Sequence, residues 1–190
     1  ELLRRLEDGV YTASVLRPQL GLRSLGVNLF AQQGPTCTEA TTRGVEVRSS
    51  AVFTPEDRSQ GWMYSIRMRL VGTAEERGFE TCQLLRRHWI IQEDGQAAEH
   101  VEGEGVIGLF PILNDEGWIL NAASDPHQQY DEVGQQPAPL MYQSCTSSFR
   151  RSGRGTFGGD LTFVPGTAEE PTGDRFTVRV APFPLFVPDI

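Results

Sequence analysis

Residues Thr81–Leu113 read TCQLLRRHWIIQEDGQAAEHVEGEGVIGLFPIL, and this stretch decides the fold. The dense run of apolar residues over Cys82–Gln92 predicts a central β-strand. Asp94-Gly95 is a strong signal for a hairpin turn, and a short returning strand is expected near Ala97–Val101. Three closely spaced glycines follow. The stretch therefore predicts a strand, a hairpin and a glycine-rich corner.

The predicted central strand has two faces, because successive side chains in a strand point in opposite directions. Simple alternation places Leu85, Trp89 and Ile91 on one face. It places on the other Leu84, Arg86, His88 and Ile90.

The clearest strand outside this stretch is Trp62–Leu70, where apolar residues recur at every second position. The residues between them are polar and are expected to face water: Ser65, Arg67 and Arg69. Further strands are predicted at 44–53, 142–149, 155–164 and 175–180. Prolines are expected to end the sheet after the last of these, at Pro182, Pro184 and Pro188.

About seven short strands with turns between them, and no long amphipathic helix, predict an all-β fold. The expected architecture is an antiparallel β-sandwich of the fibronectin-III or immunoglobulin-like type. Residues 1–40 are assigned to an N-terminal arm, which Gly34-Pro35 closes, and residues 41–190 to the sandwich domain. Residues 114–139 are interpreted as a loop insertion, because they are long for a loop in such a fold.

Composition and charge limit the partners of this 190-residue chain. Its net charge of −8 does not favour binding to nucleic acid phosphates. No apolar run approaches the ~20 residues of a membrane helix, so no membrane insertion is expected. The expected partners are other proteins of a larger assembly.

The cysteines indicate a compartment. Cys37, Cys82 and Cys145 leave one thiol unpaired under any pairing and show no C-x-x-C spacing. Buried free thiols in a reducing intracellular compartment are therefore predicted. That compartment is the cytoplasm or nucleus, or a plastid or mitochondrion if a targeting peptide was removed, because the sequence begins with Glu1.

The corner glycines Gly103, Gly105 and Gly108 match G-x-G-x-x-G, so a phosphate site has to be weighed. A dinucleotide site needs a helix after the glycines, and Pro111 prevents a helix of useful length. Nearby glutamates would also repel phosphate. A structural corner is the preferred interpretation, and an anion site formed by backbone N–H groups stays open as the alternative.

Three groups of residues are candidates for partner binding. The insertion contains the adjacent apolar residues Trp118, Ile119 and Leu120, which must either pack back on the sandwich or enter a partner. A second candidate is a patch on the predicted central strand that would bind a partner or an anion: Arg86, Arg87 and His88. A basic loop cluster consists of Arg150, Arg151 and Arg154. The alternatives for the two basic groups are a solvated strand face and a solubilising loop.

No constellation of catalytic residues is recognisable in the sequence. It contains no paired carboxylates in a cleft motif, no triad spacing and no set of metal ligands. No enzymatic activity, cofactor or metal is therefore expected.

The same residues resemble a known family. QLLRRHWIIQEDG (83–95) and VEGEGVIGLFPIL (101–113) are similar to the core signature of the ApaG domain. Three later segments agree with it: YQSCTSSF (142–149), GTFGGDLTF (155–163) and RFTVRVAPFPL (175–185). The similarity extends roughly over 41–185 and is interrupted between Leu113 and Leu140.

This resemblance implies a fibronectin-III-like β-sandwich without an established catalytic activity. ApaG domains stand alone in bacteria, where the name is linked genetically to diadenosine tetraphosphate breakdown and to cobalt and magnesium handling. In eukaryotes they are appended to F-box proteins of ubiquitin ligases, a DNA polymerase-delta interacting protein and plastid proteins. Proposals of pyrophosphate binding in the family rest on the glycine motif, which maps onto Gly103, Gly105 and Gly108.

The sequence therefore predicts a non-catalytic protein–protein interaction module that serves as a subunit or recruiting domain of a larger complex. The alternative is a small-molecule module that binds a nucleotide polyphosphate or a divalent cation, Mg²⁺ or Co²⁺, near the glycine corner.

Overall fold

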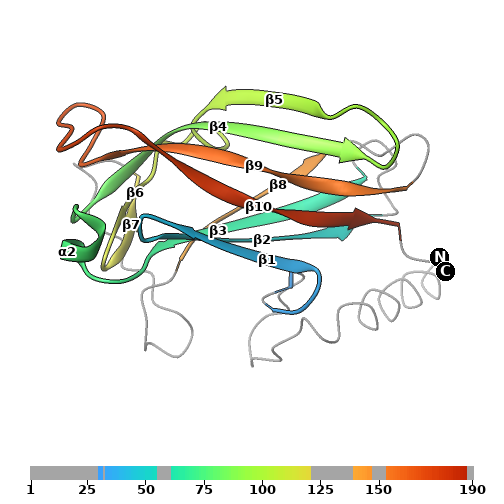
Figure 1. The fold of residues 1–190 in the computed structure, drawn as a ribbon, viewed down its shortest axis with the longest axis horizontal. Helices are drawn as coiled ribbons and strands as arrows, with labels where there is room; N and C mark the ends of the chain where they lie inside the picture. The colour runs from blue at the N-terminus through green and yellow to red at the C-terminus, as the bar shows by residue number, and fades with distance from the viewer. Residues whose placement is uncertain (1–29, 32, 55–60, 121–138, 147–152, 188–190) are drawn as a thin grey trace, which may run out of the picture.

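The computed structural model describes residues 30–31, 33–54, 61–120, 139–146 and 153–187. This part is an antiparallel β-sandwich, as predicted, with one four-residue helix, α2 (Ala74–Arg77). One sheet has the strand order β1-β2-β3-β8, and the other has the order β10-β9-β4-β6-β7 with β5 paired to β4. Figure 1 shows the layer of β4, β5, β9 and β10 facing the layer of β1, β2 and β3, with α2 at one end.

The described part contains ten strands instead of the predicted seven or so. Their bounds are β1 (Cys37–Thr42), β2 (Val45–Phe53), β3 (Trp62–Leu70), β4 (Cys82–Glu93), β5 (Glu99–Glu104), β6 (Ile112–Asn114), β7 (Gly117–Ile119), β8 (Leu140–Thr146), β9 (Arg154–Pro165) and β10 (Phe176–Phe186). The additional strands are β1, β6 and β7, which are short and lack the period-two pattern of apolar residues.

The core lies between the two sheets. Each sheet contributes side chains that are almost completely buried, including Ile66 and Met68 from β3 and Phe163 and Val178 from β9 and β10. Apolar alternation in β3 therefore predicts its core-facing side correctly. None of the helices in the described part is long and apolar enough to cross a membrane.

The opposite face of β3 was predicted to face water, and this prediction is wrong for Ser65 and Arg67, whereas the Arg69 side chain is 33% exposed. Ser65 and Arg67 are 0% and 4% exposed. Arg67 Nη2 donates to the Ala31 carbonyl at 2.8 Å and to Ser50 Oγ at 2.9 Å. Ala31, also buried, thus lies against this outer face, and burial lowers the pKa of Arg67.

The predicted faces of β4 are partly wrong because the strand contains a bulge. Leu84 pairs with Phe163 and Arg86 pairs with Thr162, so Leu85 is an extra residue without a direct partner. A one-residue insertion reverses the alternation. Leu84 and Trp89 consequently both point into the core, although strict alternation had placed them on opposite faces.

The last strand does not end at Pro182 as predicted. β10 continues to Phe186, and Pro184 pairs with Thr156 after a shift in register between Val180 and Phe183. β10 pairs only with β9 among the described strands. An edge strand tolerates proline where the missing N–H would point away from its neighbour.

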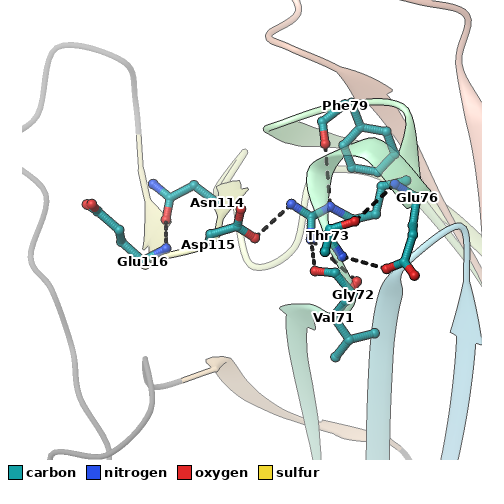
Figure 2. Close-up of polar contacts among 9 residues, drawn as sticks. Val71, Gly72, Thr73, Glu76, Phe79, Asn114, Asp115 and Glu116 are labelled. Carbon is teal, nitrogen blue, oxygen red and sulfur yellow. Dashed lines mark hydrogen bonds and ion pairs between the residues drawn. The ribbon is translucent and has the colours of Figure 1, made fainter.

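A buried arginine joins α2 to the β6–β7 hairpin. Arg77 Nη1 donates to the Gly72 carbonyl at 2.6 Å, and Nη2 donates to Asp115 Oδ1 at 2.7 Å. Further bonds at 3.4 Å reach the carbonyls of Val71 and Phe79. Figure 2 shows the Phe79 carbonyl on one side of the guanidinium, the Gly72 and Val71 carbonyls on the opposite side, and Asp115 approaching from the hairpin. The Arg77 side chain is 1% exposed, so the hairpin is anchored through a buried charge.

Candidate functional site

The glycine corner connects β5 to β6 and ends in a tight two-residue turn. Val106 N–H donates to the Leu109 carbonyl at 2.9 Å, and Leu109 N–H donates to the Val106 carbonyl at 2.8 Å. The two central residues, Ile107 and Gly108, have φ of 46° and 78°. Two central residues with positive φ are characteristic of a type I′ turn.

Contacts with backbone atoms and side chains of neighbouring residues fix the position of this turn. A Cβ on Gly105 would collide with the Leu109 carbonyl, so only glycine allows this approach. Arg87 Nη1 donates to the carbonyls of Glu104 and Gly105, both at 2.9 Å. Gln83 Nε2 donates to the Phe110 carbonyl at 3.0 Å. The turn is therefore held in one conformation by the sheet beneath it.

The apolar side chains of this turn point into solvent. Exposed fractions are 56% for Ile107, 36% for Leu109 and 39% for Phe110. We call residues Ile107–Phe110 the corner tip. Only three other large apolar side chains of the described part are exposed to this extent: Leu120, Met141 and Phe186. The corner tip thus concentrates half of them in four consecutive residues.

Ile107 is also in an unfavourable backbone conformation. A β-branched residue with positive φ is a steric outlier, which costs about 1–3 kcal/mol. Because Ile107 is more than half exposed, burial in this fold does not offset that cost. Residues in strained conformations concentrate at functional sites, and an exposed apolar one suggests contact with a partner.

The structure places the three predicted glycines in two different settings. Gly103 lies within β5, opposite Arg87, and a Cβ there would lie 2.7 Å from Arg87 Nη1. Gly105 and Gly108 have positive φ and shape the turn. The chain then enters β6, so no helix begins at this corner. A phosphate site that uses a helix N-terminus therefore has no support at residues 103–114.

The strand patch predicted from Arg86, Arg87 and His88 is divided by the pleat. Arg86 and His88 lie on the outer face of β4, whereas Arg87 points inward and reaches the corner carbonyls. Sequence reasoning placed all three together because they are adjacent. Their opposite directions follow from the alternation of side chains in a strand.

His88 belongs to a network across three strands. Its Nδ1 lies 3.0 Å from Asp160 Oδ2 on β9, and its Nε2 lies 2.9 Å from His100 Nδ1 on β5. The two imidazole rings are stacked. The network links the outer faces of β9, β4 and β5. Its members were missed at sequence level because they are far apart along the chain.

The apolar residues of the predicted insertion take different places. Trp118 lies in β7 and packs against the core, which is one of the two outcomes left open. Ile119 is half-buried, and Leu120 is 41% exposed. In the basic loop cluster, Arg154 begins β9 and is exposed, whereas Arg150 and Arg151 lie outside the described residues.

All three cysteines are free, but they are not all buried as predicted. Cys82 is fully buried, and burial raises the pKa of its thiol to about 12. Cys37 is half-buried with a pKa raised by burial, and Cys145 is exposed on β8. Strand β8 has only one face toward the core, and Cys145 lies on the other.

We expect the three thiols to react in a fixed order. A thiol-specific reagent requires access to a thiolate, so Cys145 should be modified first, Cys37 more slowly, and Cys82 only on unfolding. Mass spectrometry of the native protein at successive times measures this order. Modification of Cys82 at the rate of Cys145 would contradict the packing described here.

Among the described residues, no three His, Cys, Asp or Glu side chains are grouped so that they could hold a metal ion. The chemical features that the corner does offer are a rigid apolar tip and exposed polar groups on β5. These features suit contact with another macromolecule.

Comparison with known proteins shows related sequences. A family model described as the ApaG domain matches residues 51–118. The F-box protein SKIP16 of Arabidopsis thaliana is 34% identical over 98% of this chain, which spans 39% of that protein. Protein ApaG of Anaeromyxobacter dehalogenans is 29% identical over 78% of this chain and 94% of its own length.

Comparison with solved structures matches the ApaA protein of Bordetella pertussis. It has 20% sequence identity and a TM-score of 0.48, covering 83% of this chain and 100% of that protein.

Proposed function

Because this chain carries an ApaG domain, we propose that it is a non-catalytic protein–protein interaction module that acts as a recruiting domain or subunit of a larger complex. Nearly the whole chain aligns with two fifths of an F-box protein, so a relative of this domain forms one part of a longer polypeptide. An appended module of this kind supports a recruiting role.

The observation that carries the proposal is the corner tip. Its apolar side chains are exposed on a turn that backbone and side-chain hydrogen bonds hold rigid. A rigid apolar projection loses little conformational entropy on binding, which is favourable for an interface anchor. The strain at Ile107 is consistent with a side chain retained for contact outside this chain.

We expect Ile107→Asn to stabilise the protein and to weaken partner binding. Asparagine tolerates positive φ better than a β-branched residue, so the free energy of unfolding should rise by about 1 kcal/mol. The same change removes an exposed apolar anchor. Urea denaturation measures the stability, and quantitative affinity purification of the tagged full-length protein from its native cells measures the partners.

Leu120→Asn is the matched control, because Leu120 is also apolar and exposed but lies outside the corner tip. It should leave the recovered partners unchanged. If Ile107→Asn retains every partner, the corner tip is not the interface. If Leu120→Asn loses them instead, binding belongs to the predicted insertion.

A further inference from the structure

Strand β5, which leads into the corner tip, has one edge that does not pair with any other strand of the described part. It pairs with β4 in a regular register from Arg86↔Glu104 to Ile91↔Glu99. No other described strand pairs with it. In Figure 1, β5 lies at the outer margin of its sheet, with the corner directly after its end.

The direction of the free backbone groups follows from one hydrogen bond. Gly105 N–H donates to the Leu85 carbonyl at 2.8 Å, so it points toward β4. Backbone groups of alternate residues in a strand share a direction. The N–H groups of Val101 and Gly103 therefore also face β4, and those of His100, Glu102 and Glu104 face away from it. The Glu104 carbonyl also faces away from β4, but Arg87 Nη1 already donates to it at 2.9 Å.

The exposed side chains along this edge are acidic. Glu99, Glu102 and Glu104 are all exposed, and the Glu102 side chain is 65% exposed. Arg86 lies 3.5 Å from Glu102 and is itself half exposed, so it neutralises little of this charge. On the same strand, Val101 packs against the core. Over 101–104 the strand therefore alternates acidic positions with a small apolar and a glycine position, and His100, also exposed, lies on the same face as Glu102 and Glu104.

We infer that β5 is a docking edge for an extended basic segment of a partner protein, which is added to the sheet as a strand. This inference rests on the proposed function and gives the partner's chemistry. Arginine or lysine at alternate positions would face Glu102 and Glu104, because directly opposed residues of neighbouring strands interact. The positions between them would face Val101 and Gly103, and the segment would end against the corner tip.

One edge strand of the other sheet, β8, does not fit the same partner. Strand β8 pairs only with β3 among the described strands, and its sequence LMYQSCT carries no charged residue. It gives no complement to a basic segment. Of the two edges β5 and β8, only β5 is acidic and leads into an exposed apolar turn.

The test uses labelled hexapeptides as probes and the full 190-residue chain. The probe is an Arg-Val alternating peptide, and the controls are a Glu-Val alternating peptide and an RRRVVV peptide of the same composition as the probe. Fluorescence anisotropy should show saturable binding of the alternating arginine peptide, about tenfold tighter than that of the block peptide. Equal binding of the two arginine peptides, or no saturable binding, would overturn the inference.

Two variants of Glu102 separate backbone pairing from charge. Glu102→Pro removes an N–H group that faces away from β4, so the fold should persist while peptide affinity falls about tenfold. Glu102→Gln keeps the N–H group and should lower affinity only a few-fold, with a weaker dependence on salt. Unchanged affinity in Glu102→Pro would contradict strand addition.

Amide hydrogen exchange in the unmodified chain gives an answer that does not depend on a variant. On saturation with the alternating peptide, the amides of His100, Glu102 and Glu104 should become protected. Those of Val101 and Gly103 should already be protected in the free protein. New protection in β8 instead would refute β5 as the docking edge.

The outcomes also distinguish this inference from the proposed function. If Ile107→Asn loses its cellular partners but no peptide binds β5, the interaction module stands and strand addition is wrong. If peptides bind β5 but Ile107→Asn retains all partners, β5 is a docking edge and the corner tip is not the interface.

Discussion

Replacing Gly159 by alanine is expected to prevent stable folding of the sandwich. Gly159 lies in β9 opposite Trp89 of β4, with φ of 136°. A Cβ at this position would collide with the His88 carbonyl oxygen and lie 3.1 Å from the Trp89 Cα. Both are backbone atoms of a central strand, which cannot move without breaking its pairing with β9.

The expected loss exceeds about 4 kcal/mol, a large share of the 5–15 kcal/mol that stabilise a typical domain. Soluble yield and urea denaturation followed by tryptophan fluorescence measure it. Gly95→Ala is the control, since Gly95 also has positive φ but nothing lies within 4 Å of its added Cβ. That variant should lose only about 1 kcal/mol from backbone strain. Similar denaturation midpoints for both variants would contradict the close packing at Gly159.

The second large effect is expected for Arg77→Met. Methionine fills part of the buried volume but cannot donate to the carbonyls of Val71, Gly72 and Phe79 or to Asp115. Unsatisfied buried acceptors and a lost buried ion pair should together cost about 3 kcal/mol. The same change should loosen the β6–β7 hairpin. Urea denaturation measures the first effect, and hydrogen exchange of residues 112–119 measures the second.

Asp115→Asn separates the ion pair from the carbonyl bonds. Asp115 is 61% exposed, and the arginine keeps its backbone acceptors in this variant. Its expected cost is only about 1 kcal/mol. If Asp115→Asn were as destabilising as Arg77→Met, the ion pair would account for the whole effect, and the expected contribution of the carbonyl bonds would be wrong.

Several strands could be predicted because their burial pattern is local. Apolar residues at alternate positions in β3 report directly on a core face. The Asp94-Gly95 pair predicts the turn between β4 and β5, and Gly95 has a φ of 75°, which glycine adopts more readily than other residues. The same reasoning failed at Leu85, because a bulge depends on how β4 matches β9 and not on β4 alone.

The candidate site was only partly predictable. The glycines of the corner were identified, but the exposure of Ile107, Leu109 and Phe110 was not, since apolar residues in a sequence are first assigned to the core. Likewise, the link from His88 to Asp160 and His100 joins residues that only strand pairing brings together.

The sequence by itself determined the fold class, since apolar residues at every second position and turn-forming residue pairs are local features of the sequence. Tertiary structure alone decided which polar faces are covered and which apolar groups stay exposed. Arg67 is buried where its guanidinium bonds Ala31 and Ser50, and Ile107 is exposed because Gly105 allows a tight turn that projects it into solvent. The first outcome depends on contacts between residues far apart in the sequence, and the second on the backbone conformation of a turn. The spacing of apolar residues carries no information about either.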